Sequence, residues 1–477
     1  MDIVNIGGRE WQHSIGDEGQ DVYVAMFTVD SDNLLGKFVD ESFYDVLIDK
    51  DTDAYLPPKC DVTKTATCDN ECIKCMNEED VAFKFRKNVF SQAEQDGAFD
   101  GLYEAAAESN NRGMAAGPRV EKSGNREWVK PFQQDVLAYY ENQQPQRVDG
   151  ADQIEELIEK HKEVQYETRG EVWLRSKIEG EFGAYIGFFD VAMERLKEMS
   201  IHEAVEYAKL LRKDFVSSTS YASPLWSGIS GFYGRYPRIP YGRATAYVEQ
   251  NRELFEKSYP FARKLDKEFL RLMPERYAKQ KKHSDKLDKK FLIGEDTTLT
   301  TITVNTTTED RNARMACHRD AGSLNEGFSN LTVLTKEGKD WKGGYLVAPE
   351  VRVAINIRPG DLLLIDNMRV IHGNTPIEAP DSGIENMLRM STVFYYREDM
   401  DKLGSWDYEA ARRAFVDSRR KNEEHPSWRP FWNGVSSSMW TSDEWYDYLR
   451  AQDMGMDWLK EYHPEALVEH SSLGGFF

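Results

Sequence analysis

Short apolar segments separated by turn residues fill the stretch from residue 330 to residue 396, and this pattern constrains the fold more than any other feature of the chain. The segments span residues 330–334, 344–347, 353–357, 362–365 and 388–396, with Gly343-Gly344 and Pro359-Gly360-Asp361 as turns. Runs of this length that are rich in β-branched residues and bounded by glycine or proline are typical of strands. The pattern therefore predicts an antiparallel β-barrel or sandwich.

Two histidines and one aspartate lie beside these predicted strands. His318 and Asp320 are two residues apart, so at the end of a strand their side chains lie on one face. His372 follows the apolar run 362–365. In non-haem iron oxygenases two imidazoles and one carboxylate hold one face of Fe(II) and leave open positions for a co-substrate and O2. The three residues are therefore predicted iron ligands.

The last predicted strand carries an arginine within an apolar run. Arg389 and Ser391 share a face of this strand because side chains alternate with a period of two. An arginine there can pair with the distal carboxylate of 2-oxoglutarate through two parallel hydrogen bonds, and the serine hydroxyl adds a third donor. Both residues are predicted to bind the co-substrate.

The motifs of residues 225–400 resemble the catalytic core of the TET and base J-binding-protein (JBP) dioxygenases. They are Thr303-Val304-Asn305, His318-Arg319-Asp320-Ala321-Gly322, Gly343-Gly344, Pro349-Glu350, Arg358-Pro359-Gly360-Asp361 and His372-Gly373-Asn374-Thr375-Pro376. The resemblance implies Fe(II), 2-oxoglutarate and O2 as cofactors, and hydroxylation of the 5-methyl group of thymine or 5-methylcytosine in DNA. It also matches the iron ligands to His318, Asp320 and His372, the 2-oxoglutarate anchor to Arg389, and a strand asparagine that touches the co-substrate to Asn305.

The expected fold class is α+β. A double-stranded β-helix core, a jelly roll of the cupin-like kind, is flanked by helices and preceded by a small cysteine-containing module. The expected domains are an N-terminal module at 1–120, a helical region at 121–224, the dioxygenase core at 225–400 and a C-terminal helical region at 401–477. Amphipathic patterns with breaks near Pro260 and Pro274 predict helices immediately before the core.

Four of the five cysteines lie within sixteen residues, at Cys60, Cys68, Cys72 and Cys75. Four thiolates in close proximity can surround zinc tetrahedrally, which predicts a structural zinc knuckle. Only the last two cysteines have the spacing of a typical zinc pair, so unligated thiols are the alternative interpretation. An iron–sulfur cluster is the third and least favoured interpretation. Five cysteines in so long a chain argue against a disulfide framework.

The formal charge of −21 is unusual for a DNA enzyme, because binding to phosphates depends on lysine and arginine. Residues 225–292 differ from the rest, with 16 Lys plus Arg against 8 Asp plus Glu. This segment includes a loop in which Arg235, Arg238 and Arg243 alternate with aromatic residues and glycines. Such a loop can stack an extruded base and hold phosphates, or it can be a lid on the core. The three arginines are candidate substrate-binding residues, and DNA is the expected partner.

The start of the chain lacks a basic segment followed by an apolar one, and no apolar stretch approaches the length of a membrane span. We therefore expect no membrane association and a cytoplasmic location, in a cell or in the host cell of a virus, with the nucleus left open. Two alternatives to a DNA oxygenase stay open. One is a hydroxylase of a free nucleotide, an RNA base or a protein side chain, and the other is a non-catalytic nucleic-acid-binding protein.

Overall fold

A computed structural model describes residues 2–27, 29–30, 33–57, 77–107, 226–235, 239–309, 314–421, 442–451 and 455–464. The described residues up to 107, those at 226–233 and those at 244–401 form one compact unit. Residues 234–235, 239–243 and the described part of 402–464 belong to a second unit. Each unit is considered by itself below.

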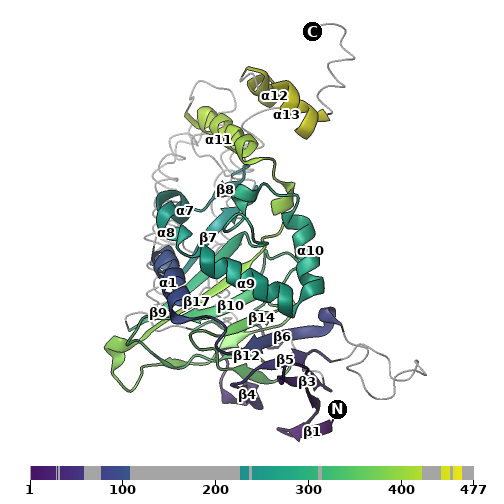
Figure 1. Ribbon diagram of the computed structural model, residues 1–477, viewed down its shortest axis with the longest axis vertical. Helices are drawn as coiled ribbons and strands as arrows, with labels where there is room; N and C mark the ends of the chain where they lie inside the picture. The colour runs from purple at the N-terminus through teal and green to yellow at the C-terminus, as the bar shows by residue number, and fades with distance from the viewer. Residues whose placement is uncertain are drawn as a thin grey trace, which may run out of the picture. The chain divides into compact units, whose positions relative to one another are not determined.

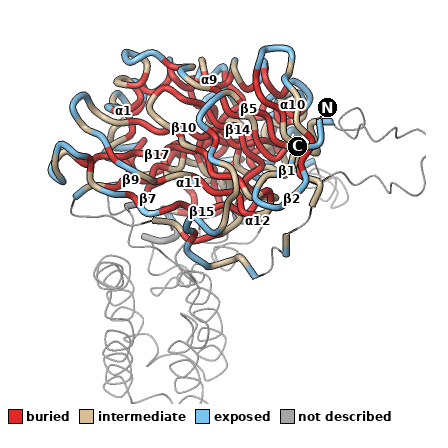
Figure 2. Tube along the Cα trace, turned by 90° about the horizontal axis from the view of Figure 1, so that it is seen from below, coloured by how far each residue is buried: buried red, intermediate tan, exposed pale blue. Residues whose placement is uncertain are grey.

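The first unit is built on a large mixed sheet (Figure 1). Ten of its eleven strands, in spatial order, are β1 (Asp2–Ile6), β2 (Arg9–Ile15), β3 (Asp21–Ala25), β5 (Thr52–Tyr55), β6 (Val81–Arg86), β14 (Leu362–Ile365), β10 (Ser329–Leu334), β17 (Leu388–Tyr395), β9 (Thr301–Thr308) and β7 (Trp226–Tyr233). Only β3 and β5 pair in parallel among these neighbours. The central strands β10, β14 and β17 are buried along their whole length (Figure 2).

A smaller sheet contains β15 (Gly373–Asn374), β12 (Leu346–Ala348), β13 (Val353–Ile355) and β4 (Val46–Ile48), in that order. The two-residue strands β11 (Lys342–Gly343) and β16 (Ile377–Glu378) pair beside it. One apolar cluster joins side chains of the two sheets, including Val333 and Leu363 of the large sheet and Leu346 and Ile355 of the small one. Two sheets that enclose an apolar interior, with helices outside, confirm the expected jelly-roll core.

Helices cover the outer face of the large sheet. α1 (Gln92–Ala107), α7 (Ala246–Gln250), α8 (Arg252–Glu256), α9 (Tyr259–Leu272) and α10 (Pro274–Ser284) precede β9, and α9 crosses in front of β10 and β14 (Figure 1). Phe261 of α9 lies 5.9 Å from Phe394 of β17 between ring centroids. Pro260 and Pro274 stand in the first turns of α9 and α10, which confirms the predicted breaks. No helix among the described residues has the length and apolar character needed to cross a membrane.

The described N-terminal residues are part of the same sheets as the core. β6 pairs with β14 in antiparallel orientation, and β4 pairs with β13 in parallel orientation. The sequence predicts a separate module at residues 1–120, whereas the structure adds these strands to the edges of the core. The cysteines at positions 60, 68, 72 and 75 and the helices predicted at 121–224 lie outside the described residues.

The second unit contains α11 (Trp406–Lys421), α12 (Ser442–Ala451) and α13 (Gly455–Tyr462). Their buried aromatic side chains form one cluster, in which Tyr408 stacks on Tyr462 and Phe415 packs against Trp445. These contacts are those of helix packing.

Candidate active site

The three predicted iron ligands lie together between the two sheets. His318 and His372 form an antiparallel bridge, with His318 N donating to His372 O at 2.9 Å and His372 N donating to His318 O at 3.0 Å. Asp320 Oδ1 lies 3.2 Å from His318 Nε2. One ligand atom of each residue lies within 4.8 Å of the others. The geometry is that of a two-histidine, one-carboxylate donor set.

Backbone carbonyls orient both imidazoles. His318 Nδ1 lies 2.8 Å from Ala316 O, and His372 Nδ1 lies 3.0 Å from Val370 O. A carbonyl can only accept, so each Nδ1 carries a proton, and this orientation leaves each Nε2 as the nitrogen that a metal would bind.

The charges of the three residues are coupled. Burial lowers the pKa of His372 to about 4, and the neighbouring charge of His318 contributes. Burial also opposes ionisation of His318, but the carboxylate of Asp320 outweighs it and raises the pKa of that imidazole. For Asp320, burial is outweighed by the hydrogen bond from His318 and the nearby imidazoles, and its pKa is lowered. A divalent cation would replace the proton of His318, and one carboxylate and two neutral imidazoles would then bind it.

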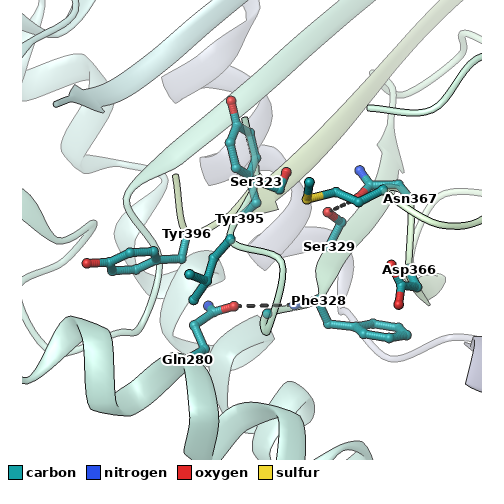
Figure 3. Close-up of a pocket in the computed structure, with 11 residues that line it drawn as sticks. Gln280, Ser323, Phe328, Ser329, Asp366, Asn367, Tyr395 and Tyr396 are labelled. Atoms are coloured by element: carbon teal, nitrogen blue, oxygen red, sulfur yellow. Dashed lines mark hydrogen bonds between the residues drawn. The ribbon is translucent and has the colours of Figure 1, made fainter. Parts of the chain in front are cut away.

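Asn367 holds the second oxygen of the aspartate. Its side-chain Nδ2 donates to Asp320 Oδ2, and its backbone carbonyl accepts from Asp320 N at 2.9 Å. Ser329 Oγ in turn donates to Asn367 Oδ1 at 2.6 Å, a bond drawn in Figure 3. The pocket in that view is lined by Asn367 and Gln280 among others but not by the three ligands. Asn367 therefore fixes the Asp320 carboxylate and leaves Oδ1 toward the histidines.

Arg389 is a buried cation without a buried counterion. It stands on β17 with 4% of its surface exposed, on the same face as the core residue Val393. No carboxylate of the described residues lies within 4 Å of its guanidinium, and its Nε has no hydrogen-bond partner there. Burial and the nearby charge of Arg358 lower its pKa to about 10, so it stays protonated at neutral pH. Because an unpaired buried charge is costly, this position calls for an anionic ligand.

Trp341 and Gly344 border the guanidinium of Arg389. Its Cζ lies 5.8 Å from the centre of the Trp341 ring. Gly344 has a φ of +67°, and a Cβ there would lie 3.4 Å from Arg389 Nε. A side chain at position 344 would thus crowd the guanidinium, and only glycine adopts this backbone conformation at little cost.

Ser391 and Asn305 lie on the same face as Arg389. Ser391 opposes Asn305 of β9 in the antiparallel register, so the two side chains are neighbours. Both are buried, and Asn305 Oδ1 has no hydrogen-bond partner among the described residues. The Arg389 guanidinium and the Ser391 hydroxyl offer donors to the carboxylate of a small dicarboxylate, whereas the Asn305 oxygen can only accept.

A prediction for Arg389 follows from its missing counterion. Replacement of Arg389 by lysine keeps the charge but removes the planar pair of donors. We expect the apparent affinity for 2-oxoglutarate to fall by about 10- to 100-fold, the equivalent of one charge-assisted hydrogen bond. Titration of 2-oxoglutarate in a turnover assay measures this effect. Lys336→Arg, a change at an exposed lysine paired with Asp100, is the control. An unchanged affinity in Arg389→Lys would remove Arg389 from the co-substrate site.

The three candidate substrate arginines fall in different environments. Arg235 forms an ion pair with the buried Glu409, whose carboxylate also accepts from Gly242 N at 2.6 Å and Gly404 N at 2.9 Å. Arg243 is half-buried at the start of β8 (Arg243–Ala244), and Arg238 lies outside the described residues. Their contact with substrate stays a prediction, and for Arg235 the structure adds a structural role.

The structure adds a cation that the sequence did not single out. The Arg397 guanidinium lies 4.7 Å from the centre of the Tyr233 ring and over Gly322, two residues after the ligand Asp320. No carboxylate of the described part of the chain lies within 4 Å of it. One signal in the sequence could have identified Arg397. It lies two residues after the end of the strand that carries Arg389, at an even spacing from Arg389, so continued alternation would place both side chains on the same face.

Comparisons with known proteins agree with this site. Residues 234–398 match the family model described as the oxygenase domain of the 2OGFeDO superfamily, Tet_JBP. The "Bifunctional helicase and thymine dioxygenase JBP2" of Leishmania braziliensis is 30% identical over 196 residues, which are 41% of this chain and 16% of that relative. The "Thymine dioxygenase JBP1" of Trypanosoma brucei brucei is 36% identical over 92 residues, 19% of this chain and 10% of that relative.

The family match covers the part of the chain that holds the site. A solved structure described as "NgTET1 in complex with 5mC DNA" is similar over 40% of this chain and 69% of that one, with 14% identity and a TM-score of 0.29. The family match includes the iron-ligand candidates His318, Asp320 and His372 as well as Arg389. Residues 234–398 of this chain are thus similar to the TET/JBP-type oxygenase domains of the 2OGFeDO superfamily.

Proposed function

We propose that this chain is an Fe(II)- and 2-oxoglutarate-dependent dioxygenase that hydroxylates the 5-methyl group of a pyrimidine, thymine or 5-methylcytosine, in DNA. The observations that carry the proposal are a His-Asp-His donor set and, in the same compact unit, a buried arginine that has no counterion among the described residues. The first is what Fe(II) requires, and the second is what the distal carboxylate of 2-oxoglutarate requires. The family match supports both cofactors.

Each residue has a distinct task in this proposal. His318, Asp320 and His372 hold the iron through Nε2, Oδ1 and Nε2, and Asn367 keeps the carboxylate in its orientation. Arg389 and Ser391 orient the co-substrate. Bound iron would supply the oxidising power: 2-oxoglutarate and O2 would give succinate and CO2, with one oxygen atom of O2 in the succinate and the other in the hydroxyl group of the product. The protein's contribution is binding, orientation and the exclusion of water from the interior between the sheets.

A thymine base as substrate is supported by the names of the relatives, of which this chain spans only a small part. The JBP relatives are named thymine dioxygenases. A methyl group in duplex DNA lies inside the base stack, so the target nucleotide has to be extruded. Arg397 stacked on Tyr233 offers donors to the oxygens of an extruded nucleotide near Asp320. The proposed products are 5-hydroxymethyluracil or 5-hydroxymethylcytosine.

A free nucleotide is the second candidate substrate, and the net charge of −21 favours it. The excess of lysine and arginine in residues 225–292 favours DNA. A non-catalytic role fits less well, because a protein without turnover has no need for an intact donor set beside an unpaired buried arginine. We further propose that Cys60, Cys68, Cys72 and Cys75 hold a structural zinc ion, which metal analysis of the purified protein would test.

The proposal is tested by anaerobic reconstitution with Fe(II) and 2-oxoglutarate followed by exposure to air. The substrates are thymine-containing DNA, 5-methylcytosine-containing DNA and the free nucleotides, and the readouts are succinate and digested nucleosides. A hydroxymethyl nucleoside that His318→Ala does not form is the expected result. Succinate with product only from free nucleotides would replace DNA by the second candidate. No succinate with any substrate would refute the oxygenase.

A further inference from the structure

An ion pair joins the two chain segments that carry the iron-ligand candidates. Arg319 lies between His318 and Asp320 in the chain, and its Nη2 donates to Glu350 Oε1 at 2.7 Å. The other oxygen of the same carboxylate, Glu350 Oε2, accepts from Ile371 N at 2.7 Å. Ile371 immediately precedes His372. One carboxylate thus contacts a neighbour of every ligand.

The arginine completes the connection from its own side. Arg319 Nε donates to Arg369 O at 2.9 Å, three residues before His372. The segment 369–371 is therefore held by Arg319 at one end and by Glu350 at the other. Arg319 and Glu350 are 34% and 15% exposed, so the pair lies at the border of the interior.

Glu350 itself is held in place by a turn between strands of the small sheet. It follows β12 and precedes β13, and Val351 N and Arg352 N donate to Ala348 O and Pro349 O, both at 3.2 Å. The Pro349-Glu350 motif thus stands on a rigid support, and the function proposed above leaves it without a role.

We infer that Glu350 is a positioning residue for the metal centre: together with Arg319 it holds the His318–Asp320 segment and the His372 segment at the separation that one metal ion requires. The inference rests on the proposed metal site. A partly exposed ion pair contributes little to global stability. Partners outside the ligand set nevertheless change metal affinity by about 10- to 100-fold, because they fix ligand orientation. The effect of Glu350 should therefore appear in metal binding more than in unfolding.

The test is titration of the full chain with Mn(II) alone, without DNA or 2-oxoglutarate. Glu350→Ala removes both contacts and should weaken Mn(II) binding by about 10- to 100-fold. Glu350→Gln can still accept from Ile371 N but presents its amide NH2 to Arg319, so its loss should be smaller. Circular dichroism and the unfolding midpoint establish that each variant is folded, and Glu350→Gln keeps the test usable if Glu350→Ala does not fold.

A nearby ion pair of similar burial provides the matched control. Arg352, two residues after Glu350, pairs with Asp45 through Nη2 at 2.7 Å and Nε at 3.0 Å, and this pair contacts no ligand-bearing segment. Asp45→Asn should leave Mn(II) affinity within about twofold of the parent. Parent-like Mn(II) affinity in both folded Glu350 variants would overturn the inference while the metal site stands. Failure of the parent to bind Mn(II), or binding that Asp320→Ala does not weaken, would overturn the metal site and the inference together.

Discussion

Asp320→Ala is expected to abolish turnover of 2-oxoglutarate and to weaken metal binding by at least about 100-fold. The change removes the only carboxylate of the donor set and leaves two imidazoles that share a single site. Even residues outside the ligand set change metal affinity by about 10- to 100-fold, so loss of a ligand should exceed that range. Succinate formation and Mn(II) titration measure the two effects.

The variant should fold, because the Asp320 side chain is partly exposed. Its hydrogen-bond partners, His318 and Asn367, both belong to the candidate active site. The control is Asp381→Ala, at a carboxylate that is 90% exposed and paired with Lys342. It should keep parental turnover and metal affinity. Retention of succinate formation in a folded Asp320→Ala protein would mean that another residue supplies the carboxylate.

Arg276→Met is expected to produce a large loss of stability, about 3–5 kcal/mol. Arg276 of α10 is 1% exposed, and its Nη2 contacts Glu79 at 2.9 Å and Asp366 at 3.1 Å. Burial already raises the pKa of Asp366. Removal of one partner from a buried pair costs up to about this amount, because Asp366 then keeps only the partly exposed Arg369, whose Nε lies 3.5 Å away. Arg263→Met, which breaks the exposed pair with Asp296, is the control and should cost about 0.5 kcal/mol.

Chemical denaturation at several pH values measures this loss and its sign. Without Arg276 the pKa of Asp366 in the folded state rises further above its unfolded value of about 3.9. A group with a raised folded pKa disfavours folding once it ionises, so the deficit of Arg276→Met should grow as pH increases above that value. Arg276→Met with Asp366→Asn should recover part of the loss. A loss in the free energy of unfolding below about 1 kcal/mol at neutral pH would contradict this prediction. It would show that water or another cation compensates the Asp366 carboxylate.

Local sequence patterns predicted the parts of the fold that depend on local chemistry. The runs 330–334, 353–357, 362–365 and 388–396 become strands because their side chains are β-branched or apolar and fill the interior of two packed sheets. The helix breaks follow from two prolines that lack the backbone donor of a helix interior. The candidate ligands could be predicted from the sequence for the same reason. The side-chain period of two in a strand places His318 and Asp320 on one face.

Pairing between distant segments left no local signal. β4 and β6 have ordinary strand compositions, and nothing in them identifies β13 and β14 as partners more than 270 residues away. The same limit applies to single side chains. Arg235 has the composition context of a substrate-binding loop, yet its guanidinium is bound by Glu409, 174 residues further along the chain. Charge alone predicts that an arginine needs a partner and does not name it.

The supports of the site were hidden for a related reason. Asn367 and Glu350 stand in turns, where polar residues are common, and only the structure shows that one holds Asp320 and the other holds Ile371. Such residues become recognisable when a buried polar atom is followed to its partner.

The central claim is that one interior site binds iron and 2-oxoglutarate and oxidises a pyrimidine methyl group in DNA. The most direct measurement is the ratio of succinate to hydroxymethyl nucleoside in a single reaction with Fe(II), 2-oxoglutarate, O2 and DNA that contains thymine or 5-methylcytosine. We expect a ratio close to one with the preferred base, and no nucleoside product from Arg389→Ala or Asp320→Ala. Succinate that forms at the same rate with and without DNA, and without any modified nucleoside, would contradict the central claim.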